Sequence, residues 1–283
     1  MDYSHYLIVT DLDGTFFGKG ARLVERNLAA IEEFKAGGGH ITAGTGRIPA
    51  NIRKGIPFCG ELFNAPAVTA NGAFIYDLAA DACIQSTPMD AEATLAAARL
   101  VEALNPNVGM RVSTGKNFLV NRSRLNAAIL RDIGGDPDTY AGEVLPLSEW
   151  RTEGAAWYKM VFRGEAEDLL SVRPAVEAAF GDTFEYSVSS PHFFELQKKG
   201  CTKATGLGFV AERLAAELGH PVTTVAAGDQ ENDLPMLLAA DIAACPENAV
   251  EAVKAVSSLR LCHHDEGCIA DLIQRLKKRT KLP

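Results

Sequence analysis

The sequence from Tyr6 to Thr15 reads YLIVTDLDGT and joins an apolar run to two closely spaced carboxylates. The apolar run predicts a buried strand, and Gly14 permits a tight turn directly after it. Ligands of open α/β sheets bind just beyond the carboxyl ends of the strands, which is where Asp11 and Asp13 would lie. Two acids at such a point are costly unless a cation joins them. The stretch therefore indicates a nucleophile and an acid/base partner assisted by magnesium, although Asp and Gly are also common in plain turns.

The overall composition is that of a globular protein with a full apolar core. The chain has 283 residues, 47% hydrophobic and 23% charged, enough for one large domain or two of ordinary size. Its formal net charge of −8 argues against nucleic acid as a main partner. The N-terminus lacks the pattern of a signal peptide, and the apolar run after it is too short to span a bilayer. We therefore expect a cytoplasmic protein whose six scattered cysteines are reduced thiols.

Strands and helices alternate in the first and last thirds of the chain. The expected strands are residues 6–10, 40–43, 67–70, 222–227 and 242–245. The expected helices are residues 23–36, a segment that ends at Gly219, and residues 268–278. Such alternation predicts an α/β fold with a parallel sheet and helices on both of its faces.

The middle of the chain has a different pattern. Between about residues 83 and 192 we expect antiparallel strands, because segments 110–114 and 117–121 flank Gly115-Lys116, which suits a hairpin turn. Further strands at 157–162 and 184–188 and helices at 91–104 and 166–180 complete an α+β module. We therefore divide the chain into a discontinuous core domain, residues 1–83 and 193–283, and an inserted domain, residues 84–192.

Four polar clusters follow core strands or open a helix. In chain order they are Asp11-Leu12-Asp13-Gly14-Thr15, Thr45-Gly46-Arg47, Lys203 at the end of Lys199-Gly200-Cys201-Thr202-Lys203, and Gly228-Asp229-Gln230-Glu231-Asn232-Asp233. These clusters, in this order, resemble the four motifs of the haloacid dehalogenase-like (HAD) phosphatase superfamily. Asn71-Gly72-Ala73, the inserted module and residues 265–270 resemble its Cof-type, class IIB-capped branch. The resemblance covers nearly the whole chain and implies a Rossmann-like parallel-sheet core with an inserted α+β cap domain of the C2B type.

The resemblance also implies a role for each cluster. Asp11 would attack phosphorus and form an aspartyl-phosphate, while Asp13 would act as general acid and base. Thr45 would hydrogen-bond a phosphoryl oxygen, and Lys203 would offset the charge of the carboxylates and the phosphate. The implied metal is Mg²⁺, with ligands or supporting residues Asp11, Asp13 (through its backbone carbonyl), Asp229 and Asp233. The implied substrate-binding residues are Thr45, Gly46, Arg47, Asn71, Lys203 and Asn232.

The function implied is hydrolysis of a small phosphorylated metabolite, with a sugar phosphate as the leading substrate class. The cap would set specificity, and its side chains with suitable chemistry are Arg111, Lys116, Lys159, His192 and Glu195. Two alternatives stay open: a phosphosugar mutase of the same fold, and a sensor that binds sugar phosphates without turnover. The intact pair of Asp11 and Asp13 disfavours the sensor. We expect a monomer or a small homo-oligomer, with no nucleic-acid or membrane partner.

Residues 262–268, with the sequence CHHDEGC, carry side chains that could bind zinc. Structural zinc sites usually pair cysteines two to four residues apart in two such clusters, a spacing that this segment lacks. We therefore favour a loop near the magnesium site as the interpretation of this segment. The basic residues 277–281 are expected to form a solvated tail at the end of the last helix.

Overall fold

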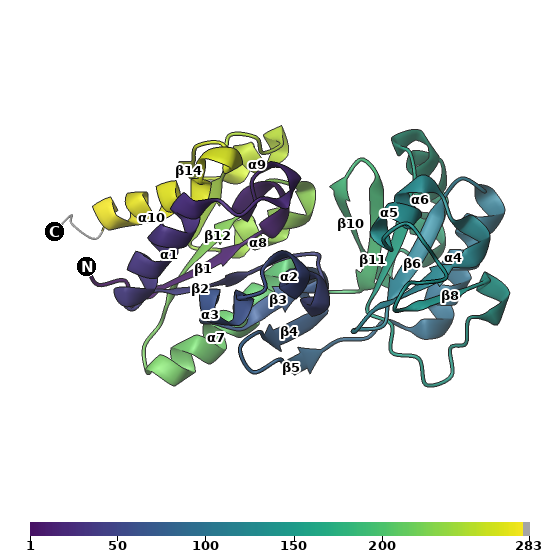
Figure 1. The fold of residues 1–283 in the computed structure, drawn as a ribbon, viewed down its shortest axis with the longest axis horizontal. Helices are drawn as coiled ribbons and strands as arrows, with labels where there is room; N and C mark the ends of the chain where they lie inside the picture. The colour runs from purple at the N-terminus through teal and green to yellow at the C-terminus, as the bar shows by residue number, and fades with distance from the viewer. Residues whose placement is uncertain (280–283) are drawn as a thin grey trace. The chain divides into compact units, whose positions relative to one another are not determined.

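The computed structural model describes residues 1–279 and divides the chain into two compact units (Figure 1). Unit 1 comprises Met1–Ser86 and the chain from Thr202 onward, and unit 2 comprises Thr87–Cys201. Residues 280 and 281 of the expected basic tail lie outside the described part of the chain. Within residues 1–279 all six cysteines are free thiols, and no helix combines the length and apolarity needed to cross a bilayer.

Unit 1 is built on a parallel sheet of five strands. In spatial order they are β14 (Leu259–Arg260), β13 (Ile242–Cys245), β12 (Thr223–Ala227), β1 (Tyr6–Thr10) and β2 (His40–Ala43). Thr10, at the end of β1, lies opposite Ala227 of β12 and Ala43 of β2, so the carboxyl ends of three strands meet at one edge. The predicted parallel core is therefore confirmed, and β1, β2 and β13 have the predicted bounds.

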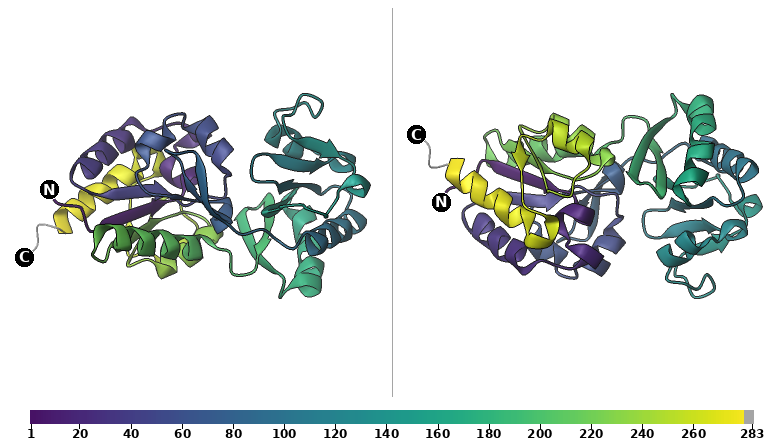
Figure 2. Two further views of the ribbon diagram at one scale, coloured as in Figure 1. Left: turned by 90° about the horizontal axis from the view of Figure 1, so that it is seen from below. Right: turned by 90° about the horizontal axis from the view of Figure 1, so that it is seen from above.

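Helices cover both faces of this sheet. Tyr6 and Ile8 of β1 face one helical layer, whereas Leu7 and Val9 face the other, and all of them are buried. The first layer contains α1 (Glu25–Ala36), α10 (Cys268–Arg279) and the short helices α2 (Pro49–Gly55) and α3 (Cys59–Leu62). The second contains α7 (Lys203–Leu218), α8 (Leu234–Ala239) and α9 (Glu251–Val256). Figure 2 shows α1 and α8 on opposite sides of the sheet, which explains why β1 is apolar on both faces.

A smaller antiparallel sheet also belongs to unit 1. Its strands are β3 (Ala67–Thr69), β4 (Phe74–Asp77) and β5 (Ala82–Ser86), in that order. The prediction that residues 67–70 add a strand to the parallel sheet is wrong, because β3 pairs with β4 and reaches the parallel sheet through a bridge between Val68 and Gly44. The chain reverses after β3 because Ala70, Asn71 and Gly72 all take left-handed backbone angles.

Unit 2 has the predicted α+β architecture around a six-stranded mixed sheet. Its strands, in spatial order, are β10 (Phe184–Ser190), β11 (Phe193–Lys198), β9 (Lys159–Arg163), β6 (Gly109–Ser113), β7 (Phe118–Asn121) and β8 (Glu143–Leu145). Helices α4 (Ala91–Leu104) and α6 (Ala166–Phe180) pack on its apolar face. The expectation of antiparallel strands throughout is wrong for β7 and β8, which are parallel because the segment with α5 (Ala127–Asp132) carries the chain back between them.

Unit 2 extends past residue 192, the boundary drawn from the sequence. β11 begins at Phe193 and pairs with both β9 and β10 in the sheet of unit 2. Glu195 and Gln197 alternate in this strand with the buried Phe194 and Leu196, which is the period-two pattern of a strand with two different faces. In the structure, unit 2 ends at Cys201, two residues before Lys203.

Candidate active site

Asp11 lies at the carboxyl end of β1, where its backbone continues the sheet for one residue. Its amide donates to the carbonyl of Ala227 at 2.8 Å, which joins the tips of β1 and β12. The tip of β2 reaches the same edge, because the Gly44 amide donates to the carbonyl of Thr10 at 2.8 Å. Three segments that are distant in sequence therefore meet at the Asp11 side chain, which is only 10% exposed.

Lys203 supplies the cation of this site. It is the first residue of α7, whose N-terminus is capped by reciprocal hydrogen bonds between Thr202 and Thr205. Its buried Nζ donates to Asp11 Oδ1 at 2.7 Å and to Asp233 Oδ1 at 2.6 Å. Burial alone would lower the pKa of Lys203, but the negative charges of Asp11 and Asp233 outweigh it and raise that pKa. The ammonium group therefore stays charged and connects Asp11, which follows β1, to Asp233, which lies in the loop after β12.

The loop after β12 holds the other two carboxylates in place. Asp233 Oδ2 accepts hydrogen bonds from the backbone amides of Asp229 at 2.9 Å and Gln230 at 3.1 Å. Both oxygens of Asp233 are thus engaged, one by the loop and one by Lys203. Asp229 Oδ1 accepts from the hydroxyl of Thr15 at 2.7 Å, which connects this loop to the turn that follows Asp11.

The turn after Asp11 approaches the loop of Asp229 closely, and this approach requires a glycine at position 14. Its φ of +85° is a left-handed backbone angle that other residues adopt at a cost. A Cβ atom at this position would lie 2.4 Å from Asp229 Oδ2, well inside contact distance. The glycine that the sequence suggests for a tight turn therefore also makes room for a carboxylate from the far end of the chain.

With all three carboxylates ionised, the buried part of the site carries a net charge of −2. Asp11, Asp229 and Asp233 contribute −3 and Lys203 contributes +1, and one oxygen from each carboxylate lies within 4.8 Å of the others. Burial raises the pKa of Asp11 well above its ordinary value, against the opposing effect of Lys203, and the neighbouring aspartates raise it further. Burial and Asp233 raise the pKa of Asp229 to about 7. A divalent cation would supply the positive charge that these oxygens lack, so the residues present fit such an ion.

Asp13, two residues after Asp11, has a different environment. Its side chain is 59% exposed and does not belong to the buried cluster. Both of its oxygens accept from Arg47, at 2.6 and 2.7 Å, and the guanidinium also lies 4.9 Å from the ring centre of Phe17. A planar guanidinium that binds both carboxylate oxygens fixes the orientation of Asp13. This ion pair therefore joins the first sequence cluster, which contains Asp13, to the second, which contains Arg47.

The loop after β2 meets the reversal that follows β3. Thr45 is buried, and its carbonyl accepts from the amide of Asn71 at 3.0 Å. Asn71 holds a left-handed φ of 57° without being a glycine, and its side-chain oxygen accepts from Asn232 at 3.4 Å. Strained backbone of this kind persists only where the surrounding structure holds it in place. The structure thus brings Thr45, Gly46 and Arg47 next to Asn71, and Asn71 next to the loop of Asp229.

Three of the five candidate specificity residues, Arg111, Lys159 and Glu195, take part in ion pairs within unit 2. Lys159 pairs with Glu195 at 3.0 Å, and both side chains are buried. Arg111 pairs with Asp132 at 2.9 Å, together with Arg163, which sequence reasoning did not single out. Lys116 is exposed in the β6–β7 turn, and His192 Nδ1 lies 3.1 Å from the Gly164 carbonyl. Lys159, Glu195 and Arg111 therefore help to hold the sheet of unit 2 together.

Two residues of the site, Thr15 and Asn248, received no role from the sequence analysis. Thr15 binds Asp229, and Asn248 donates to the Gly14 carbonyl at 2.8 Å. Thr15 stands four residues after Asp11, so its place in the turn was visible as a signal. Asn248 had no such signal, because the bond that it makes spans 234 residues of chain.

Comparisons with known proteins agree over the length of the chain. A sequence profile described as haloacid dehalogenase-like hydrolase matches residues 8–273. The chain is 25% identical to 5-amino-6-(5-phospho-D-ribitylamino)uracil phosphatase of Bacillus subtilis (strain 168), over 97% of this chain and 98% of that protein. It is 24% identical to pyridoxal phosphate phosphatase of Escherichia coli (strain K12), over 94% and 97% respectively. A solved structure of a HAD subclass IIB sugar phosphatase has a similar fold, with a TM-score of 0.77, 23% identity, and coverage of 96% of this chain and 98% of that one.

Proposed function

Because the chain belongs to the haloacid dehalogenase-like hydrolase family and is a Cof-type, subclass IIB phosphatase of small phosphorylated metabolites, we propose that it hydrolyses a sugar phosphate. The reaction would pass through an aspartyl-phosphate on Asp11. The observation that carries the proposal is the buried cluster of Asp11, Asp229 and Asp233 around Lys203, at the edge where the strands of unit 1 end. This cluster offers a nucleophile, a fixed cation and carboxylate oxygens for a metal ion in one place.

We propose Mg²⁺ as the cofactor, held by the carboxylates of Asp11 and Asp229 and by the backbone carbonyl of Asp13. When bound, Mg²⁺ neutralises the repulsion between the attacking carboxylate and the phosphate dianion. Asp233 would position Lys203 and hold the loop after β12 in place, because one of its oxygens accepts from Lys203 and the other from the Asp229 amide. We therefore propose that Asp233 supports the ion without being one of its direct ligands.

In the first chemical step, an Asp11 oxygen attacks phosphorus while the bond between phosphorus and the ester oxygen breaks. Asp13 gives its proton to the departing sugar oxygen. Lys203 keeps its charge beside the attacking group, and the Thr45 hydroxyl hydrogen-bonds a phosphoryl oxygen. In the second step Asp13 removes a proton from water, the water oxygen attacks phosphorus, and Asp11 leaves with the electron pair of its bond to phosphorus. Inorganic phosphate and the free carboxylate result.

The remaining candidates would bind substrate around this centre. We propose that Gly46 offers its backbone amide to the phosphate, as in an anion-binding loop. Arg47, Asn71 and Asn232 would line the same place, since hydrogen bonds connect Arg47 to Asp13 and Asn71 to Asn232. The loss of any one of these side chains should raise KM more than it lowers kcat.

Two of the three similar proteins support a sugar phosphate as the substrate class, whereas the E. coli relative is named for pyridoxal phosphate. The name of the B. subtilis relative describes a phosphate ester on a ribityl chain, which carries several hydroxyl groups. The solved structure of similar fold is named as a sugar phosphatase. A cytoplasmic location would suit such a substrate.

The proposal is tested by phosphate release from a panel of pentose, hexose and polyol phosphates, with Mg²⁺ or with a chelator. We expect Mg²⁺-dependent release in the wild type and almost none in Asp11→Asn, which keeps the volume and removes the nucleophile. Release that requires a sugar bisphosphate as activator would favour the mutase. Binding of sugar phosphates without release from any of them would favour the sensor, and full activity of Asp11→Asn would refute the covalent route.

A further inference from the structure

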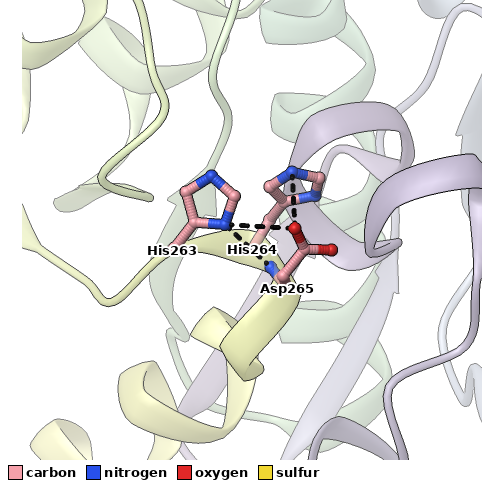
Figure 3. A group of neighbouring side chains, drawn as sticks. All are labelled: His263, His264 and Asp265. Carbon is pink, nitrogen blue, oxygen red and sulfur yellow. Dashed lines mark hydrogen bonds and ion pairs between the residues drawn. The ribbon is translucent and has the colours of Figure 1, made fainter.

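We infer that His263, His264 and Asp265 form a second metal site, suited to a transition-metal ion such as Zn²⁺ and separate from the carboxylate cluster. One ligand atom from each of the three residues lies within 4.8 Å of the others (Figure 3). His263 Nδ1 lies 3.5 Å from Asp265 Oδ2, and His264 Nε2 lies 4.0 Å from the same oxygen. Ligand atoms around tetrahedral Zn²⁺ are separated by about 3.3 Å, given bonds of about 2.0 Å. Small side-chain rotations would therefore complete the site.

His264 is already oriented for metal binding. Its Nδ1 lies 2.6 Å from the carbonyl oxygen of Phe17, and because a carbonyl can only accept, Nδ1 carries the proton. The lone pair of the neutral ring then lies on Nε2, the nitrogen that faces Asp265. Metal-bound histidines almost always donate their other N–H to a carbonyl or a carboxylate in this way. The ring is thus held in the tautomer and orientation that a metal requires.

Asp265 is oriented by the same principle. Its Oδ1 accepts from the backbone amide of Lys19 at 2.6 Å and lies 3.6 Å from the guanidinium of Arg22. The other oxygen, Oδ2, is the one that faces both histidines. The third ligand is held less firmly: His263 Nδ1 accepts a long bond of 3.3 Å from the Asp265 amide, which a metal ion would displace.

The donor set favours one class of ion. Two imidazole nitrogens and one carboxylate suit Zn²⁺ and its neighbours in the transition series, whereas Mg²⁺ prefers oxygen ligands alone. His263 and Asp265 are 36% and 35% exposed, so an ion can enter from solvent and water can fill the remaining position. The flanking cysteines do not join the set; Cys268 is buried and donates its thiol to the carbonyl of Thr15.

The site lies next to the turn that carries Asp13. The amide of His264 donates to Asn248 Oδ1 at 3.2 Å, and the amide group of Asn248 donates to the carbonyl of Gly14 at 2.8 Å. Together with the bond from His264 to Phe17, these contacts attach the metal-binding residues to both halves of the turn. An ion bound here should therefore stabilise unit 1 against unfolding.

The test is Zn²⁺ binding to the full chain, measured by calorimetry in saturating Mg²⁺ so that the carboxylate cluster is occupied. We expect one Zn²⁺ per chain and binding at least tenfold weaker in His263→Asn and in His264→Asn. His263→Asn is the decisive variant, because His264→Asn also removes the bond to Phe17. Zn²⁺ binding that is unchanged in His263→Asn would overturn the inference.

Two control variants test two other places where Zn²⁺ could bind. Cys83→Ser removes the exposed thiol, and Asp229→Asn alters the carboxylate cluster. Binding should be unchanged in both, and loss of the Zn²⁺ in either one would refute the assignment. Co²⁺ serves as a second probe, since an absorption spectrum without a thiolate band supports nitrogen and oxygen ligands, whereas a thiolate band contradicts them.

Discussion

Raising the pH from 5 to 7 without divalent ions should destabilise the folded protein, because of Asp229. Burial and the nearby Asp233 raise the pKa of Asp229 from 3.8 to about 7. Between these two values the folded chain holds a proton that the unfolded chain has released. The contribution of this group to stability is therefore complete below pH 3.8 and is lost as the pH rises through 7.

The size of this loss follows from the two pKa values. Each additional proton held by the folded state changes the free energy of unfolding by about 1.4 kcal/mol per pH unit. Asp229 is almost fully protonated in the folded state at pH 5 and half protonated at pH 7, so the loss over this interval is about 2 kcal/mol. Burial raises the pKa of Asp11 as well, which adds to the loss in the same direction. A bound divalent ion should remove the effect, since it holds these carboxylates in their charged form.

Urea unfolding followed by circular dichroism at pH 5, 6 and 7 measures this effect, with a chelator or with saturating Mg²⁺. Asp229→Asn is the matched control, because it keeps the shape of the side chain and cannot titrate. In chelator the wild type should lose about 2 kcal/mol more than this variant between pH 5 and 7, and Mg²⁺ should abolish the difference. Equal pH dependence of wild type and Asp229→Asn in chelator would refute the reasoning.

Three substitutions test other contacts of the site. Lys203→Met leaves the carboxylates without their cation and should destabilise unit 1 by about 3–5 kcal/mol at pH 8, measured by urea unfolding; wild-type stability would contradict the buried ion pairs. Gly14→Ala brings a Cβ against Asp229 and should weaken activation by Mg²⁺ about 10–100-fold, measured by Mg²⁺ titration of phosphate release. Arg47→Lys loses the two-point contact with Asp13 and should lower kcat/KM about tenfold, with a stability change below about 1 kcal/mol because Asp13 is exposed. Unaltered kinetics in Arg47→Lys would show that the pair has no role in turnover.

The sequence predicts those parts of the fold that depend on residues close to one another along the chain. β1 and the helices α4 and α6 follow from local apolar patterns, and their bounds agree with the prediction. The prediction for β3 is wrong because the partner of this strand is decided by the left-handed backbone of Ala70 and Asn71, which is uncommon outside glycine and has no local signal at Ala70. β11 was overlooked although its alternation of Phe194, Glu195 and Leu196 is visible in the sequence.

Some residues of the candidate site are likewise visible in the local sequence, whereas its contacts between distant segments are not. Asp11 and Asp13 stand out because they share one turn, whereas Lys203 was recognised through the resemblance alone. The contacts of Thr15 with Asp229 and of His264 with Phe17 span 214 and 247 residues. No local pattern encodes such contacts, since they arise only when parallel strands bring their loops to one edge of the sheet.

The turn after β1 gives two similar carboxylates different environments, which suits the roles proposed for them. Asp11 is buried beside Lys203, so its position is fixed, as a nucleophile in line with phosphorus requires. Asp13 is largely exposed and is oriented by Arg47, so its carboxylate stays accessible to a leaving group. The backbone turns directly after Asp13 because Gly14 takes a left-handed φ of +85°. A pair of acids with separate environments is the arrangement that lets one attack while the other transfers protons.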